Sequence, residues 1–232
     1  MATICPTVTT SGIHEFREQL ERLEKFAKRI HIDVADGSMT PNKLAPLAQI
    51  WKPKHIRTDL HLMVKQPGQY LDQAIKLAPN LIILQAEAEG DFATFSKQIH
   101  HAVCKVGVAL LPETNVDVIK PALHLIDHVL IFSGHLGSYG GQADLDLLKK
   151  IKLLKSLKPS LEIGWDGGVD NENALVIANA GTDVLNVGGF IQQSEDPRGA
   201  YAKLKAIVEE KTPNGLEKTD NRRIRIKSDG NS

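Results

Sequence analysis

The sequence predicts an α/β fold in which eight parallel strands alternate with eight helical segments and close into a (β/α)8 barrel. Short apolar runs alternate along residues 2–210 with longer segments whose apolar residues recur at helical spacing. Ionisable residues stand at or near the ends of several of these runs, and no Gly-x-Gly-x-x-Gly turn follows the first run. An open sheet of six strands is the alternative, and it requires two of the eight runs not to be strands.

The predicted strands are short apolar runs, of which the first is rich in β-branched residues. It is followed by residues 9–12, Thr-Thr-Ser-Gly, which form a turn able to cap the next helix. The second ends in an Asp-Gly turn. The predicted strands are residues 2–8, 29–34, 55–64, 81–85, 105–110, 126–132, 161–164 and 184–187.

The predicted helices lie between and after these strands. Residues 13–28 indicate a helix because Phe16, Leu20 and Leu23 recur at helical spacing with charged residues between them. Pro67 opens another helix, since proline is favoured in the first helical turn. The predicted helices are residues 13–28, 44–51, 67–77, 91–103, 116–123, 143–157, 171–180 and 197–210.

The composition predicts one barrel domain over residues 1–210 and a polar tail over residues 211–232. Hydrophobic residues make up 42% of the 232 residues, which is enough for a sizeable core. The tail contains only three aliphatic residues, so we expect a disordered extension that cannot bury enough apolar surface to fold. A nucleic-acid-binding arm around Arg222 and Arg223 is the less favoured alternative, because basic runs are usually solvated.

Charge and cysteine content exclude several classes of function. Lys plus Arg equals Asp plus Glu, 28 each, so no net charge favours nucleic acid or an anionic membrane as a partner. Cys5 and Cys104 are isolated, and without a Cys-x-x-Cys motif they indicate buried free thiols in a reducing compartment. We expect a soluble cytoplasmic protein, because no apolar run approaches the roughly 18 residues of a membrane span and no secretory signal is recognisable.

The segment His-Ile-Asp-Val-Ala-Asp-Gly at residues 31–37 contains candidate metal ligands. Its alternation places His31 and Asp33 on one face of a strand. Burying a lone charge is costly, but a divalent metal would partner both groups, because imidazole and carboxylate are good ligands for such ions. This segment alone leaves a half-exposed edge strand with a polar outer face as an equal alternative.

Two further motifs favour the metal site. Residues 59–64 read Asp-Leu-His-Leu-Met-Val, and residues 163–169 read Ile-Gly-Trp-Asp-Gly-Gly-Val. In their order and spacing, the three motifs resemble the ribulose-phosphate 3-epimerase family from about residue 2 to about residue 209. The resemblance implies a ribulose-phosphate-binding TIM barrel with one divalent ion, which is Zn, Fe(II), Mn or Co. The implied metal ligands are His31, Asp33, His61 and Asp166.

The resemblance also implies an isomerase that inverts C3 of a ketose phosphate, with conversion of D-ribulose 5-phosphate to D-xylulose 5-phosphate as the first expectation. In this family two metal-bound aspartates act as acid and base on opposite faces of C3, and the metal stabilises an enediolate. The matching residues are Asp33 and Asp166. The implied partners are a sugar phosphate and further copies of the chain in a homo-oligomer, without nucleic acid or membrane.

Glycine pairs near the ends of the sixth, seventh and eighth predicted strands are candidates for holding the phosphate. Backbone N–H groups at such turns bind phosphate, and barrel enzymes often place it after strands seven and eight. The alternative is that each pair only closes a tight turn. Thr7 and Met63 are added because their positions match substrate contacts in the family. The candidate substrate-binding residues are therefore Thr7, Met63, Gly140, Gly141, Gly167, Gly168, Gly188 and Gly189.

The chain departs from the family pattern around the expected pocket. Residues 135–142 read His-Leu-Gly-Ser-Tyr-Gly-Gly-Gln in place of a loop close to Pro-Gly-Phe-Gly-Gly-Gln, and Gln85 replaces a histidine. A 3-epimerase of another ketose phosphate, such as D-allulose 6-phosphate, and a non-catalytic sugar-phosphate-binding barrel therefore stay open. A lyase of the hexulose-phosphate synthase or orotidine-phosphate decarboxylase type is disfavoured. Those enzymes carry Asp-x-Lys-x-x-Asp, whereas Ala35 follows Asp33 here.

Overall fold

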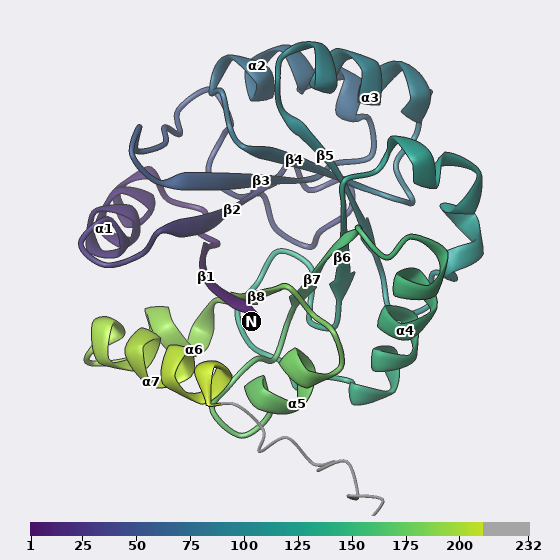
Figure 1. The fold of residues 1–232 in the computed structure, drawn as a ribbon. Helices are drawn as coiled ribbons and strands as arrows, with labels where there is room; N and C mark the ends of the chain where they lie inside the picture. The colour runs from purple at the N-terminus through teal and green to yellow at the C-terminus, as the bar shows by residue number, and fades with distance from the viewer. Residues whose placement is uncertain (211–232) are drawn as a thin grey trace, which may run out of the picture.

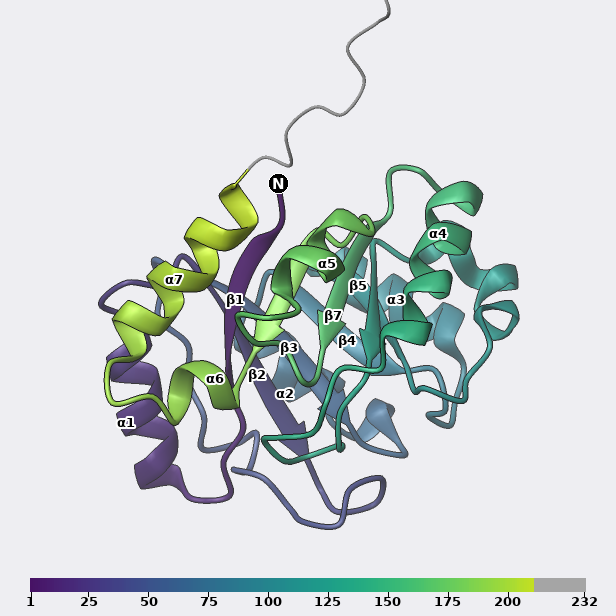
Figure 2. The same ribbon diagram turned by 90° about the horizontal axis from the view of Figure 1, so that it is seen from below.

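A computed structural model of the chain describes residues 1–210, in which eight strands form one closed parallel barrel. Helices surround the strands on the outside (Figure 1), and the view after a quarter turn shows α1 and α7 beside β1 (Figure 2). The strands are β1 Thr3–Val8, β2 Arg29–Ala35, β3 Arg57–Met63, β4 Leu81–Gln85, β5 Lys105–Leu110, β6 His128–Phe132, β7 Glu162–Asp166 and β8 Val184–Val187. Because β8 pairs with β1, the predicted barrel is confirmed and the open six-stranded sheet is excluded.

Most of the crossovers between strands contain a helix. The α-helices are α1 Ile13–Leu23, α2 Leu71–Lys76, α3 Phe92–His101, α4 Leu148–Leu157, α5 Ala174–Asn179, α6 Gly189–Gln192 and α7 Pro197–Glu209. Four short 3-10 helices are η1 Pro67–Gln69, η2 Val116–Val118, η3 Lys120–Leu125 and η4 Leu145–Leu147. The short helix α6 was not predicted, because four residues are too few to display a helical period.

The helix predicted at residues 44–51 is wrong, since this segment consists of bends and turns. Its Ala45 N–H donates to the carbonyl oxygen of Thr10 at 2.8 Å instead of to its own segment. Pro46 follows, and the residue before a proline avoids the helical conformation. The crossover from β2 to β3 therefore contains no helix.

Other boundaries differ by smaller amounts. The helix predicted at residues 13–28 ends at Leu23, and the amides of Phe26 and Ala27 bond back to the Leu23 carbonyl as the chain turns toward β2. Residues 116–123 form η2 and η3 rather than an α-helix, and Pro121 lacks the N–H that a continuous α-helix would use there. The predicted tail, residues 211–232, lies outside the described residues, so the domain boundary at residue 210 stays a prediction.

The strands direct apolar residues outward, toward the helices, and several polar residues into the barrel. On β2, the alternate residues Ile30, Ile32 and Val34 belong to the main apolar core, as a strand's two-residue period requires. The intervening residues on this strand include two of the predicted metal ligands. Within residues 1–210, no helix is both long and apolar enough to cross a membrane.

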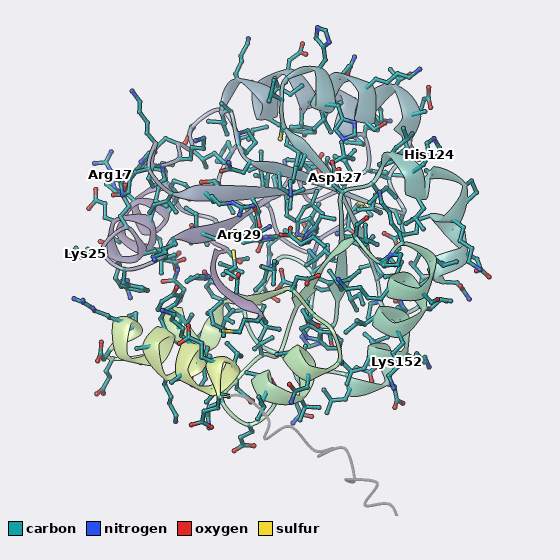
Figure 3. All side chains as sticks on the ribbon, in the orientation of Figure 1. Arg17, Lys25, Arg29, His124, Asp127 and Lys152 are labelled. Carbon is teal, nitrogen blue, oxygen red and sulfur yellow. The ribbon has the colours of Figure 1, made fainter. Side chains whose placement is uncertain are left out.

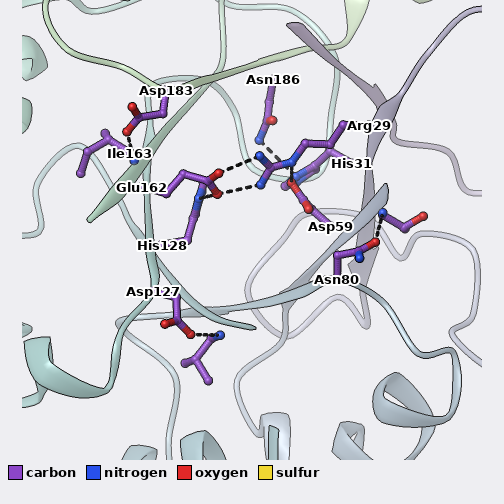
Figure 4. Close-up of polar contacts among 12 residues, drawn as sticks. Arg29, His31, Asp59, Asn80, Asp127, His128, Glu162, Ile163, Asp183 and Asn186 are labelled. Atoms are coloured by element: carbon purple, nitrogen blue, oxygen red, sulfur yellow. Dashed lines mark hydrogen bonds and ion pairs between the residues drawn. The ribbon is translucent and has the colours of Figure 1, made fainter. Parts of the chain in front are cut away.

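A buried charge network occupies the amino-terminal end of the barrel. Arg29 Nε donates to Asp59 Oδ2 at 2.7 Å, and its two terminal nitrogens donate to the Glu162 carboxylate at 3.0 and 2.8 Å. His128 Nδ1 lies 2.8 Å from Glu162 Oε2 (Figure 4). The side chains of Arg29 and Asp59 are 4% and 1% exposed, and Figure 3 shows Arg29 among the strands rather than at the periphery. One guanidinium therefore bonds to two carboxylates from different strands, and the His128 ring lies beside the second of them.

The environment of Glu162 reflects this pairing. Burial alone would raise the pKa of its carboxyl, but the hydrogen bonds from His128 and Arg29 hold that pKa well below its usual range. The charged form of Glu162 is therefore favoured in the folded barrel, and it is stabilised by the cation of Arg29 beside it.

Replacing Arg29 with methionine is expected to destabilise the barrel by about 3–5 kcal/mol, because Asp59 and Glu162 would stay buried without their cation. The matched control is Arg57→Met, which removes an exposed arginine paired with Arg29 in the β2–β3 ladder. Urea unfolding of both variants measures the difference. Equal stability of the two variants would contradict the role given to the buried network.

Candidate functional site

The strand register brings the four predicted metal ligands together toward the carboxyl-terminal ends of the strands. Asp33 on β2 lies opposite His61 on β3, and Asp166 on β7 lies opposite Asn186 on β8. His31 lies two residues before Asp33 and therefore points to the same side of β2. One ligand atom from each of the four residues lies within 4.8 Å of those of the other three. Active sites of such barrels lie at this end.

Asp33 stands at the centre of the cluster. Its Oδ1 lies 3.2 Å from His31 Nε2 and 3.0 Å from His61 Nδ1, while Thr9 Oγ1 donates to its Oδ2 at 2.5 Å. Asp166 Oδ2 lies 3.6 Å from the same His31 Nε2. Both imidazoles are fully buried, so their ring positions are fixed by packing as well as by these contacts.

The two carboxyl groups have opposite pKa shifts in the protein alone. Burial by itself would raise the pKa of Asp33, but the charges and hydrogen bonds of His31 and His61 hold it well below its usual range. Burial raises the pKa of Asp166 to about 7, and the negative charge of Asp33 acts in the same direction against the attraction of His31. Two buried carboxyl groups this close cannot both ionise easily without further positive charge.

The donor set fits a divalent transition ion. Two imidazole nitrogens and two carboxylate oxygens converge in a small volume, and such ions accept both kinds of ligand. A bound cation would supply the positive charge that the two carboxylates lack. His31 Nε2, His61 Nδ1 and one oxygen each of Asp33 and Asp166 are the atoms that face one another. The cluster does not discriminate between Zn, Fe(II), Mn and Co.

A cavity of about 280 Å³ opens beside the cluster. Asp33 and Asp166 line it together with most of the candidate substrate-binding residues, which are Thr7, Gly140, Gly141, Gly167, Gly168, Gly188 and Gly189. Met63 lies outside the lining and packs with Ala35 and Leu44 in a separate apolar cluster. The cavity therefore extends from the cluster of four candidate metal ligands to the glycine turns after β6, β7 and β8.

The turn after β7 requires its two glycines. Gly167 has a φ of 105° and Gly168 a φ of 69°, which is the left-handed region that favours glycine. A Cβ at Gly167 would collide with the backbone of Gly134, and one at Gly168 with the backbone of Ala143. The geometry of a tight turn is therefore enough to explain why glycine stands at both positions. Phosphate binding by their N–H groups stays a prediction.

The loop that differs from the family pattern is fastened over the cavity by Tyr139. The Tyr139 hydroxyl accepts from the N–H of Thr9 at 2.8 Å and donates to Gln19 Oε1 at 2.6 Å. Its ring packs against Gly188, where an added Cβ would approach the ring to 2.5 Å. This loop thus contacts the segment after β1, helix α1 and the turn after β8.

Three polar residues make contacts in the site that were not predicted, although Gln85 was already placed at the expected pocket as the replacement of a histidine. Thr9 contacts Asp33, as described above, and the sequence offered no signal for it. Gln85 at the end of β4 and Asn186 on β8 contact the rings of His61 and His31. Asn186 could have been found, because it is the one polar residue in the apolar run Val-Leu-Asn-Val.

The fold and the site together define a (β/α)8 barrel with a candidate divalent-metal centre beside a glycine-lined cavity. Residues 3–191 match the ribulose-phosphate 3 epimerase family, and the chain belongs to this family. It is 28% identical over 216 residues to the ribulose-phosphate 3-epimerase of Aquifex aeolicus strain VF5, covering 90% of this chain and 97% of that protein. It is 30% identical over 215 residues to the Bacillus subtilis strain 168 enzyme of that name, covering 88% and 99%.

Solved structures of two enzymes that are named for sugar phosphates share the fold. A 3-hexulose-6-phosphate synthase superposes with a TM-score of 0.63 at 15% identity, covering 89% of this chain and 99% of that one. A 3-keto-L-gulonate-6-phosphate decarboxylase from Vibrio cholerae gives 0.64 at 13% identity, covering 89% and 97%. At these identities the likeness concerns the barrel alone.

The predicted ligand set has a direct test. Protein prepared without chelators should contain about one divalent ion per chain, as expected of a single four-ligand site. His61→Ala should lose most of it, because a quarter of the ligands is gone, whereas His100→Ala, which removes a surface imidazole, should keep it. Elemental analysis of the three proteins gives the metal content. Full metal content in His61→Ala would show that the ligands have been misassigned.

Proposed function

We propose that this protein is a metal-dependent 3-epimerase of a ketose phosphate, with D-ribulose 5-phosphate and D-xylulose 5-phosphate as the substrate pair. The observation that carries the proposal is the pair of buried carboxyl groups, Asp33 and Asp166, which line one cavity beside two buried imidazoles. Membership of the family supports the same reaction class.

Inversion at C3 needs a base on one face of the carbon and an acid on the other. Asp33 and Asp166 come from β2 and β7, which are not neighbours in the barrel, and both reach the same cavity. The group that acts as base depends on which sugar phosphate is the substrate.

A divalent ion bound to the four ligands would supply Lewis-acid stabilisation of the negative charge that develops beside C3. Thr9 orients the Asp33 carboxylate through the hydrogen bond to its Oδ2. The N–H groups of the glycine turns beside the cavity are suited to the phosphate of the substrate. A sugar phosphate would then lie along the cavity, between the metal cluster and the turns after β7 and β8.

The lyase alternative has less support despite the shared barrel. The sequence around Asp33 lacks the lysine of the Asp-x-Lys-x-x-Asp motif, because Ala35 stands at that position and is buried. A barrel of this kind hosts many reactions, so the likeness in fold does not favour that chemistry.

The altered loop favours a second candidate, which is epimerisation of another ketose phosphate such as D-allulose 6-phosphate. Tyr139 packs on Gly188 and accepts a hydrogen bond from Thr9 just after β1, so this loop shapes the cavity near the candidate phosphate-binding turns. The same contacts motivate a third candidate, a sugar-phosphate-binding barrel without catalysis. Assays of the purified protein against a panel of ketose phosphates distinguish the three.

Replacing Asp33 or Asp166 with asparagine should lower epimerisation at least about a hundredfold, because the size is kept and the basic oxygen is lost. Both residues are also candidate ligands, so the metal content of each variant is measured in the same samples. Rates are compared only for chains that hold metal.

The matched control is Asp36→Asn, because this carboxylate lies just beyond β2 and bonds to Ser38 and Tyr70 instead of to the cluster. It should retain the rate of the unmodified protein. Undiminished activity in both Asp33→Asn and Asp166→Asn with metal bound would rule out these residues as the acid and base.

A further inference from the structure

Two buried side-chain amides contact the outer nitrogens of the two candidate metal-binding histidines. Gln85 Nε2 lies 2.9 Å from His61 Nε2, and Asn186 Nδ2 lies 3.1 Å from His31 Nδ1 (Figure 4 draws the second contact). The amides are 3% and 2% exposed, and they come from strands β4 and β8 on opposite sides of the cluster. Each histidine ring is thus held between Asp33 on its inner nitrogen and an amide on its outer nitrogen.

These contacts determine where each neutral ring carries its proton. An amide nitrogen can only donate, so the ring nitrogen that faces it must accept. The ring proton then lies on the inner nitrogen, which is Nε2 of His31 and Nδ1 of His61. Both inner nitrogens face Asp33 Oδ1, which accepts their protons.

The amide oxygens have no such partners. Gln85 Oε1 and Asn186 Oδ1 are buried and form no hydrogen bond within the described part of the chain. A buried acceptor left unpaired typically costs about 1–3 kcal/mol. The amides therefore complete the histidine contacts while leaving their own acceptors unused. The Asn186 nitrogen also donates to Asp166 Oδ2 at 3.5 Å, a longer contact that the Asn186→Leu variant removes together with the contact to His31.

Metal binding exchanges the donor and acceptor roles of the two nitrogens in each histidine ring. A metal takes the lone pair of the inner nitrogen, so the single ring proton must lie on the outer nitrogen, which becomes a donor. An amide nitrogen cannot face that N–H. A half-turn of the amide group exchanges its nitrogen and oxygen, and the unpaired oxygen then accepts from the ring.

We propose that Gln85 and Asn186 are positioning residues that fix the metal-binding tautomers of His61 and His31 by presenting their amide oxygens to the outer ring nitrogens when metal is bound. The inference rests on the metal site of the proposed function. Each ring stays neutral: it loses the proton on the inner nitrogen to solvent and gains one from solvent on the outer nitrogen. A carboxamide suits this change, because it offers a donor in one orientation and an acceptor in the other.

The affinity for Zn²⁺ alone, measured by chelator competition, tests the proposal. Gln85→Leu and Asn186→Leu should each weaken zinc binding about 10–100-fold, the usual cost of losing a partner of a metal-bound histidine. Gln85→Glu and Asn186→Asp should restore much of the affinity, because a carboxylate always presents an acceptor. The matched control is Gln192→Met, which removes a buried amide that bonds to the Thr7 carbonyl rather than to either ring. Thermal melts establish that each variant is folded.

Nitrogen-15 NMR of the histidine rings reads the tautomers directly, at a pH where both rings are neutral. We expect protons on His31 Nε2 and His61 Nδ1 without metal, and on His31 Nδ1 and His61 Nε2 with zinc. Zinc-bound rings without those outer protons, or folded leucine variants with unchanged zinc affinity, would overturn the inference. If either result is obtained while His61→Ala loses zinc in the same experiment, the inference about the amides is wrong but the metal-site assignment is still supported. If the unmodified protein and Gln192→Met bind no zinc, the metal site and this inference both fall.

Discussion

The register of the parallel strands is the constraint on which the site depends. Asp33 meets His61 because β2 and β3 pair with those residues opposite each other, and Asp166 meets Asn186 through the corresponding register of β7 and β8. A slip of one residue in either pair would turn a ligand from the interior toward the helices, because strand side chains alternate between faces. Closure of the sheet through β8 and β1 removes the free edges where such a slip could begin. The apolar packing outside the strands and the chemistry inside them are therefore fixed together.

The interior of the barrel holds ionisable groups at both ends, and the two ends are balanced differently. At the amino-terminal end, Arg29 forms ion pairs with both Asp59 and Glu162 within the protein. At the carboxyl-terminal end, Asp33 and Asp166 share two imidazoles, and the pKa of Asp166 rises to about 7 because it is buried beside another negative charge. In the first arrangement the protein supplies the cation itself, and the ion pairs stabilise the fold. The second lacks a full positive charge, which is the property that suits it to a divalent cation and to proton transfer.

Most of the fold was predictable because each strand is a local apolar run. The bounds of β4, β5 and β8 agree with the predicted ones, and the three motifs that supply the ligands could be recognised within a few residues each. The helix predicted at residues 44–51 is absent because the backbone N–H of Ala45 bonds to Thr10, a residue far away in sequence that no local pattern indicates. The contact of Gln85 with His61 depends on the register between β3 and β4, and that of Tyr139 with Gln19 joins segments that only the closed barrel brings together, so neither could be predicted from local patterns.

In the proposed reaction, the carboxyl groups of Asp33 and Asp166 exchange the proton at C3 of a ketose phosphate. The most direct measurement follows D-ribulose 5-phosphate in deuterium oxide by NMR, with the protein loaded in turn with each candidate divalent ion. We expect D-xylulose 5-phosphate that carries deuterium at C3, because the new proton comes from an acid in exchange with solvent. Absence of conversion with every ion, or a product that carries only the original hydrogen at C3 after prolonged turnover, would contradict it.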